Sequence, residues 1–226
     1  MDYWELKIAQ MYQTLLKSSK LGLLLLLAIS CNKNNTTLPY YNTADFTPIF
    51  SESIDEVEKL VPHKIGDFKL TNQNNEEVSH KNIEGKVHIA SFIFTSCGSI
   101  CPTMTRNLKR VEEEYGTNPD VKILSYSVTP WKDSVPVLKA YEKEFDIQTK
   151  NWHFLTGSKK DIYNLARTSY FAEENIGLQK DSNDFLHTEH IILVDREKRI
   201  RGIYNGTLEL EIMQLSKDIE SLLESK

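Results

Sequence analysis

The stretch "GKVHIASFIFTSCGSICPTMT", residues 85–105, joins an almost continuous apolar run to two cysteines that lie four positions apart, Cys97 and Cys101. The run over residues 85–94 is rich in β-branched and aromatic side chains, which predicts a strand buried on both faces of a sheet. The cysteines follow this strand directly. They raise the question of whether the pair forms a structural disulfide, exchanges electrons or holds a metal.

A helix is expected directly after the cysteines. Apolar side chains recur at helical spacing between Met104 and Tyr115, which predicts a helix over residues 102–115 with Pro102 in its first position. A thiol near the first turn of a helix lies close to free N–H groups and to the positive end of the helix dipole, and both lower its pKa. Redox exchange and metal binding both need the thiolate, so this placement does not separate the two uses.

Outward from this stretch, strands and helices alternate. The pattern predicts hairpins over residues 65–78 and 190–205, strands over residues 121–128 and 152–155, and helices over residues 135–145, 159–168 and 208–223. Alternating strands and helices are typical of parallel crossover units. The order predicts an α/β, thioredoxin-like fold. We expect a central mixed sheet flanked by helices, with an extra hairpin and a long insertion, residues 170–186, before the last strands.

Composition limits the function classes. The chain has 226 residues, a formal net charge of −5 and no block of basic residues, so nucleic acid is not expected as a partner. It has three cysteines, far too few for a scaffold held together by disulfides, so each cysteine needs its own explanation.

The first cysteine, Cys31, follows two lysines and the apolar run of residues 21–30. This run is too short for a membrane span, which needs roughly 20 apolar residues, and it indicates a signal peptide instead. A small residue directly before the cysteine resembles a bacterial lipoprotein signal, in which the cysteine is lipidated. We therefore expect a signal over residues 1–30, with Met11 as the possible true start, a polar tether over 31–45 and one domain over 46–226.

The spacing of Cys97 and Cys101 leaves all three uses open. One helical turn brings their Cα atoms into the upper part of the range that a disulfide permits. A structural disulfide that closes so small a loop would constrain the unfolded chain little. The two sulfurs could instead converge on one metal ion. Two thiolates suit Cu(I), and an added imidazole also allows Cu(II).

Six histidines are candidates for that imidazole. His187 and His190 lie at the entry to the strand that, in a thioredoxin-like sheet, runs beside the cysteine-bearing strand. Because they are three residues apart on an extended chain, we expect only one of them to face the cysteines. The other four are expected to be ordinary packed or surface residues: His63, His80, His88 and His153.

The position of the last proline, Pro136, also bears on the use of the pair. Thiol oxidoreductases of the thioredoxin plan place a cis-proline just before the strand that begins near His190. This chain has a histidine region there instead, which weakens a purely electron-exchanging use.

Taken together, these segments resemble the Sco/SenC family, membrane-tethered thioredoxin-fold proteins that deliver copper to the CuA centre of cytochrome c oxidase. The resemblance covers most of the chain after the apolar run. It is carried by "LPYYNTADFTPIF" (38–50), "IASFIFTSCGSICPTMT" (89–105), "SYSVTPWKDSVPVLKAYEKEF" (125–145), "WHFLTG" (152–157) and "HTEHIILVDREKRIRGIYNG" (187–206).

The resemblance implies that Cys97, Cys101 and His187 bind Cu(I) or Cu(II) and pass it to the oxidase subunit that carries the CuA site. It also implies that the dithiol can reduce a disulfide of the acceptor before copper is transferred, and that oxidation of the pair to a disulfide blocks binding. Because no glutathione pool keeps thiols reduced outside the cytoplasm, we expect an envelope thiol reductase to reduce the pair again. With Cys31 lipidated, the protein would be anchored to a bacterial membrane in the cell envelope, facing the periplasm or the exterior. No ligand role is implied for His190.

Two positions depart from the family pattern. Gly98 stands where many members have proline, and Thr129 stands where many have aspartate, although Asp133 remains.

The alternative function is an envelope thiol-disulfide oxidoreductase that does not depend on copper. A peroxidase is a weaker third, because no arginine is expected beside the cysteines: Arg106 would point one turn down the helix.

Overall fold

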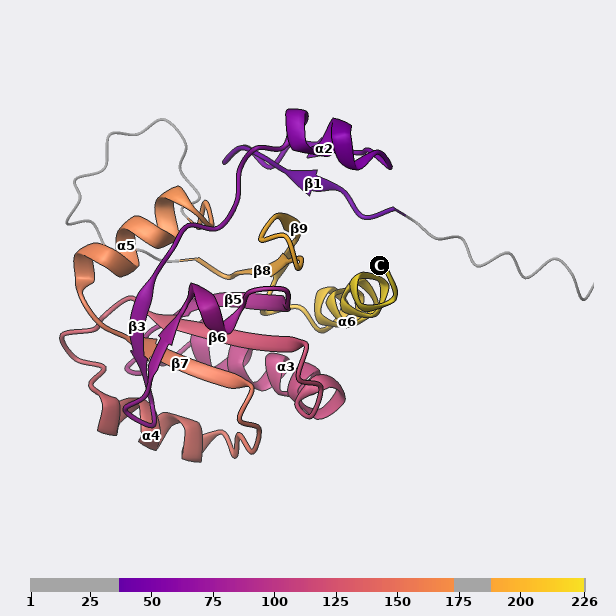
Figure 1. Cartoon of the computed structure of the whole chain (residues 1–226). Helices are drawn as coiled ribbons and strands as arrows, with labels where there is room; N and C mark the ends of the chain where they lie inside the picture. The colour runs from indigo at the N-terminus through magenta and orange to yellow at the C-terminus, as the bar shows by residue number, and fades with distance from the viewer. Residues whose placement is uncertain (1–36, 173–187, 226) are drawn as a thin grey trace, which may run out of the picture. The chain divides into compact units, whose positions relative to one another are not determined.

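A computed structural model describes residues 37–172 and 188–225 of the chain. Within these residues the strands form one nine-stranded sheet in the order β2-β1-β9-β8-β5-β6-β7-β3-β4 (Figure 1). The strands are β1 (Tyr40–Tyr41), β2 (Pro48–Ile49), β3 (Lys69–Asn72), β4 (Glu77–Ser79), β5 (Val87–Ile93), β6 (Val121–Ser127), β7 (Trp152–Thr156), β8 (His190–Val194) and β9 (Ile200–Asn205). The helices are α2 (Ile54–Leu60), α3 (Ile100–Tyr115), α4 (Val135–Glu144), α5 (Lys159–Thr168) and α6 (Glu209–Glu224), with one 3₁₀ turn, η1 (His80–Asn82).

The sheet is mixed, as the sequence predicted. Strands β5, β6 and β7 are parallel and are connected through α3 and α4, whereas β8 lies antiparallel to β5 on its other side. This antiparallel register pairs Ser91 with Ile191 and His88 with Val194. The start of β8 therefore lies beside the end of β5, where the cysteine loop begins. The thioredoxin-like fold class is confirmed.

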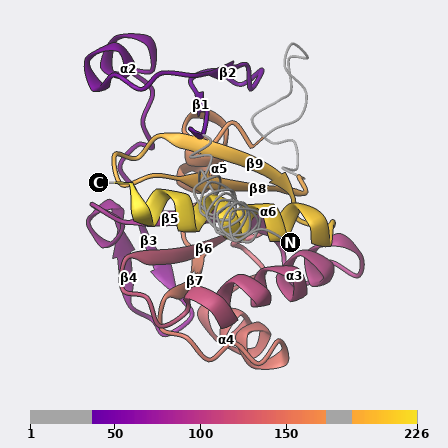
Figure 2. The ribbon, with the colours of Figure 1, turned by 90° about the vertical axis from the view of Figure 1, so that its right-hand side faces the viewer.

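Two apolar cores cover the two faces of the sheet, whose strands and covering helices are drawn in Figure 2. One core lies under α3, α4 and α6, and the other lies under α5. Strand β5 is buried along its whole length: Val87, Ile89 and Ile93 face the first core, and Ala90 and Phe92 face the second. This alternation explains the nearly continuous apolar run in the sequence, because a strand covered on both faces has no solvent-facing position.

The predicted first hairpin is present as β3 and β4, which pair antiparallel. Its turn is built by asparagines. The side-chain oxygen of Asn72 accepts hydrogen bonds from the backbone N–H groups of Asn74 and Glu76, both at 2.9 Å. Asn75 adopts a left-handed conformation with φ of 61°, which asparagine tolerates better than most residues.

Helix α3 begins at Ile100, two residues earlier than the sequence predicted. Pro102 is therefore the third helical residue and not the first. This position still suits proline, because the first four N–H groups of a helix have no partner within it. As a consequence, Cys101 lies within the first turn of the helix.

The described end of the predicted tether is part of the sheet. Tyr41 pairs with Ile200 of β9, and the guanidinium group of Arg201 lies 3.7 Å from the centre of the Tyr40 ring. Arg201 also donates to the backbone carbonyls of Leu38 and Pro39, at 2.7 and 2.9 Å. The prediction of a polar tether over residues 31–45 is therefore wrong for Tyr40 and Tyr41, because the sheet begins at Tyr40.

Two further predictions fall outside the described residues: the signal over residues 1–30, with Cys31 after it, and most of the insertion over residues 170–186. Within the described ranges, the helices are all too short or too polar to span a membrane.

Candidate functional site

The cysteine pair lies between the end of β5 and the first turn of α3. The backbone N–H of Cys97 donates to the carbonyl of Phe94 at 3.1 Å, which closes a tight turn at the end of the strand. Cys97 is half-buried, whereas Cys101 is only 3% exposed and packs in the core with Met104. Both are free thiols, and they hydrogen-bond to each other.

The helix start acts directly on the sulfur of Cys97. Burial by itself would raise the pKa of this thiol. Hydrogen bonds from the backbone N–H groups of Cys101, Ser99 and Ile100, together with the Cys101 thiol, outweigh burial and lower the pKa below its ordinary value. These N–H groups are donors that a helix leaves without an internal partner, as the position of the pair predicted.

Cys101 has the opposite tendency. Burial raises the pKa of its thiol to about 12, and the Cys97 thiol adds to the increase. The hydroxyl of Tyr141 lies nearby and forms a hydrogen bond of 2.8 Å with the hydroxyl of Thr105. Burial, and then the charges of the two cysteines, raise the pKa of Tyr141. The pair therefore has one accessible sulfur that ionises readily and one buried sulfur that does not.

A buried carboxylate connects the cysteine loop to the loop after β6. Asp133 is 0% exposed. It accepts hydrogen bonds from the hydroxyls of Thr95 at 2.6 Å, Ser127 at 2.5 Å and Thr129 at 2.9 Å. The backbone N–H of Thr95 approaches the same group at 3.4 Å. No single segment of sequence indicates this network, because Thr95 and Asp133 come from different loops.

The third predicted ligand, His187, lies outside the described residues, so the structure does not bring it together with the cysteines. Thr188 is the first described residue after it, two positions before β8 begins. Among the described residues, no group of three or more His, Cys, Asp and Glu side chains could hold a metal. The two sulfurs could supply two soft donors to a metal such as Cu(I).

The other histidines have structural surroundings. His88 is buried in β5 with its Nε2 3.1 Å from the Tyr170 hydroxyl. His190 is partly buried, and its ring centroid lies 6.0 Å from that of Phe46 in an edge-on arrangement. His63 stacks on Phe171 at 4.3 Å between centroids. The prediction that His63 and His88 are ordinary packed residues agrees with these contacts.

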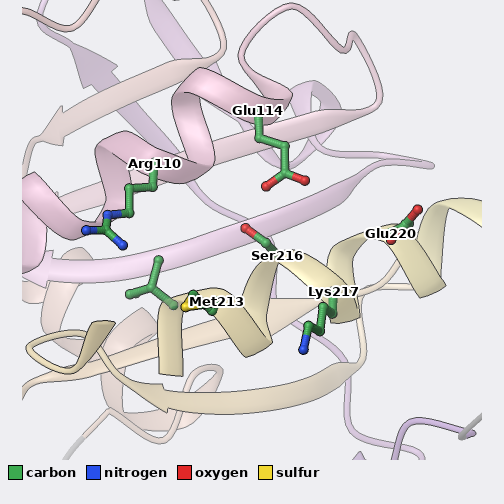
Figure 3. Close-up of a pocket in the computed structure, with 7 residues that line it drawn as sticks. Arg110, Glu114, Met213, Ser216, Lys217 and Glu220 are labelled. Atoms are coloured by element: carbon green, nitrogen blue, oxygen red, sulfur yellow. The ribbon is translucent and has the colours of Figure 1, made fainter. Parts of the chain in front are cut away.

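A surface pocket elsewhere on the molecule is separate from the cysteines. It lies between α3 and α6, has a volume of about 310 Å³ and is lined by charged side chains together with Ile212 and Met213 (Figure 3). Arg110 and Glu114, which line it, lie more than two helical turns beyond Cys101 on α3. We therefore assign this pocket no part in the site.

The fold and the site define a class: thioredoxin-like proteins with a paired thiol at the start of a helix. Comparison with known proteins identifies the family within that class. The family model described as SCO1/SenC matches residues 57–224, so the chain belongs to the SCO1/SenC family.

Solved structures agree with this assignment. A SCO1/SenC family lipoprotein from Bacillus anthracis is 28% identical, with a TM-score of 0.62 over 72% of this chain and 96% of that one. BsSco, a member of the Sco family of cytochrome c oxidase assembly proteins in which a disulfide switch was identified, is 29% identical, with a TM-score of 0.60 over 73% and 95%. ScoI of Bradyrhizobium japonicum with copper bound is 27% identical, with a TM-score of 0.55 over 70% and 98%.

Proposed function

We propose that this protein binds copper through Cys97, Cys101 and His187 and delivers it to the CuA site of a respiratory cytochrome c oxidase. The observation that carries the proposal is the reduced cysteine pair at the start of α3, with one sulfur accessible. Sheet topology supports the third ligand, because β8 runs antiparallel to β5 and His187 precedes β8 by three residues at the end nearest the cysteine loop. A related structure contains copper.

The chemistry of the pair suits a metal that is held and then released. Thiolates are soft ligands that prefer Cu(I), and one imidazole extends the site to Cu(II). Copper binding requires both sulfurs to be reduced, so a Cys97–Cys101 disulfide would block loading. The copper is cargo, and transfer is an exchange of these ligands for those of the acceptor. An envelope thiol reductase would return an oxidised pair to the dithiol form.

We also propose that Cys31 is lipidated after removal of residues 1–30, and that the residues between Cys31 and β1 form a short tether to the membrane. Support comes from the apolar run that ends at Cys31 and from the related lipoprotein of Bacillus anthracis. The mass of the protein purified from membranes tests this directly. Cys31→Ser should remove the lipid mass and release the protein into the soluble fraction, whereas an unchanged mass would refute lipidation.

The proposed copper site is tested by titrating the reduced protein with copper. One copper should bind per chain in the wild type, and Cys97→Ser, Cys101→Ser and His187→Ala should each weaken binding. For Cu(II), His187→Ala should also remove much of the thiolate charge-transfer absorption. His190→Ala is the matched control, since it removes a histidine three residues away and should leave both readouts unchanged. Equal spectra for wild type and His187→Ala would rule out His187 as a ligand.

A second candidate, a thiol-disulfide reductase of envelope proteins, is favoured by the unequal thiols. An accessible sulfur with a lowered pKa can attack a substrate disulfide, and a buried partner can then resolve the mixed disulfide. This function predicts disulfide exchange without copper and the same rate in His187→Ala. A rate no faster than that of a small dithiol would rule it out.

A further inference from the structure

Asp133 is the most deeply buried carboxylate among the described residues: it is 0% exposed, whereas the others that are buried are 7–8% exposed. Arg201 pairs with Asp195 at 3.1 Å, but no cation pairs with Asp133 within the part of the chain that the structure describes. Neutral donors surround it instead: three hydroxyls and one backbone N–H. A buried carboxylate without a cation depends strongly on each of these hydrogen bonds.

The donors come from two different places. Ser127 and Thr129 belong to the end of β6 and the loop after it, near Asp133 in the sequence. Thr95 belongs to the cysteine loop, two residues before Cys97, and contributes both its hydroxyl and its N–H. The carboxylate thus fastens the first half of the cysteine loop to the rest of the sheet. The second half is fastened by α3, because Cys101 is buried in its first turn.

We propose that Asp133 is a positioning residue for the cysteine pair: through Thr95 it holds the segment before Cys97 in place, so that the Cys97 sulfur stays within reach of the Cys101 sulfur. The part of this inference that concerns copper rests on the proposed function. The part that concerns the two thiols does not, because it follows from the hydrogen bonds alone. A loop that is already ordered loses less conformational freedom when its two sulfurs join to each other or bind one ion.

Two matched substitutions separate this role from simple structural support. Thr95→Val and Thr129→Val each remove one hydroxyl from the same carboxylate and keep the shape of the side chain. Only Thr95 lies on the cysteine loop. If Asp133 positions the pair, Thr95→Val should change the chemistry of the thiols and Thr129→Val should not. If Asp133 only stabilises the fold, the two variants should lower stability without separating in thiol chemistry.

The first readout is the equilibrium with glutathione, in which the protein dithiol and one oxidised glutathione give the protein disulfide and two reduced glutathione molecules. We expect Thr95→Val and Asp133→Asn to lower this equilibrium constant about three- to tenfold, because a loosened loop lowers the effective concentration of one thiol at the other. Thr129→Val should stay within about twofold of the wild type by the same argument. Equal constants for Thr95→Val and Thr129→Val would overturn the proposal.

The second readout is copper affinity, measured by competition with a chelator. Residues that orient metal ligands cost about tenfold or more in affinity when they are changed, and we expect a loss of this size in Thr95→Val and Asp133→Asn. If the wild type binds no copper, the proposed function fails and the glutathione equilibrium still tests the role of Asp133. If the wild type binds copper and both variants keep its affinity and its glutathione constant, the role of Asp133 is refuted and the copper function stands.

Discussion

Acidification should destabilise this protein through His88, on the cysteine-bearing strand. His88 is 0% exposed, and its Nε2 forms a hydrogen bond of 3.1 Å with the Tyr170 hydroxyl, which in turn lies 3.0 Å from the Tyr126 hydroxyl. Its Nδ1 is buried without a hydrogen-bond partner within the described ranges. Burial, and secondarily the positive charge of Lys198, lowers the pKa of this imidazole to about 3.

The sign and size follow from proton linkage. In the unfolded chain the imidazole of His88 has its ordinary pKa of about 6.5, so between pH 6.5 and 3 the unfolded state binds a proton that the folded state excludes. Stability must therefore fall as the pH falls through this window. Between pH 7 and pH 5 the two pKa values give a loss of about 2 kcal/mol from this one residue.

The experiment compares urea unfolding of the reduced wild type with that of His88→Phe at pH 7 and pH 5. Phenylalanine keeps an aromatic ring in the core, and the Tyr170 hydroxyl keeps its Tyr126 partner. Between pH 7 and pH 5 the free energy of unfolding of the wild type should fall by about 2 kcal/mol more than that of the variant. This corresponds to a difference of roughly 1 M in the shift of the urea midpoint. Other groups titrate in both proteins and cancel in the difference. An equal pH dependence of the two proteins would refute the reasoning.

Three further outcomes are expected. Alkylation of the reduced protein at pH 7, followed by mass spectrometry, should label Cys97 first, because a pKa of about 12 leaves about a thousandfold less thiolate at Cys101 than an ordinary value of 9.0 would; equal labelling would contradict this. Gly202→Ala should lower the free energy of unfolding by about 1–3 kcal/mol, since its Cβ would lie 2.2 Å from the Tyr204 hydroxyl oxygen; an unchanged urea midpoint would contradict it. Arg201→Ala should expose the chain ahead of β1 to limited proteolysis, because the guanidinium binds two of its carbonyls; unchanged cleavage would show that other contacts hold it.

The core elements were predictable because their signal is local. The apolar run of β5 and the helical spacing in α3 each reflect burial that the sequence itself determines, so their positions agree with the structure within two residues. Strand β1 was not predictable. It has only two residues, and the arginine that holds the chain ahead of it lies more than 160 positions away. A segment stabilised only by such distant contacts carries no periodic pattern of its own.

The candidate site divides in the same way. The spacing of Cys97 and Cys101 at the start of a predicted helix is a local pattern, and it indicates paired thiols from the sequence alone. The role of Asp133 could not be inferred, because its hydrogen bond to Thr95 joins residues 38 positions apart. A single aspartate in a loop more often indicates a turn than a buried carboxylate that joins two loops by hydrogen bonds.

The hydrogen bonds to Asp133 offer a physical reason why residue 129 is threonine and not the aspartate that the family resemblance leads us to expect. An aspartate at this position, which is 4% exposed, would place a second buried carboxylate against that of Asp133. Two such charges in contact repel each other, and one of them would be driven to hold a proton. Threonine instead donates a hydrogen bond to Asp133 at 2.9 Å.

This chain therefore has one buried carboxylate in this loop, that of Asp133, and surrounds it with hydroxyl donors. Because Asp133 is 0% exposed, it cannot contact a partner protein directly. Any influence of this loop on a partner must come through exposed side chains such as that of Trp131, which is 57% exposed, or through the position of the cysteines themselves. The hydrogen bond between Asp133 and Thr95 connects this loop to the cysteines, so the loop can influence the thiols although residue 129 is a threonine.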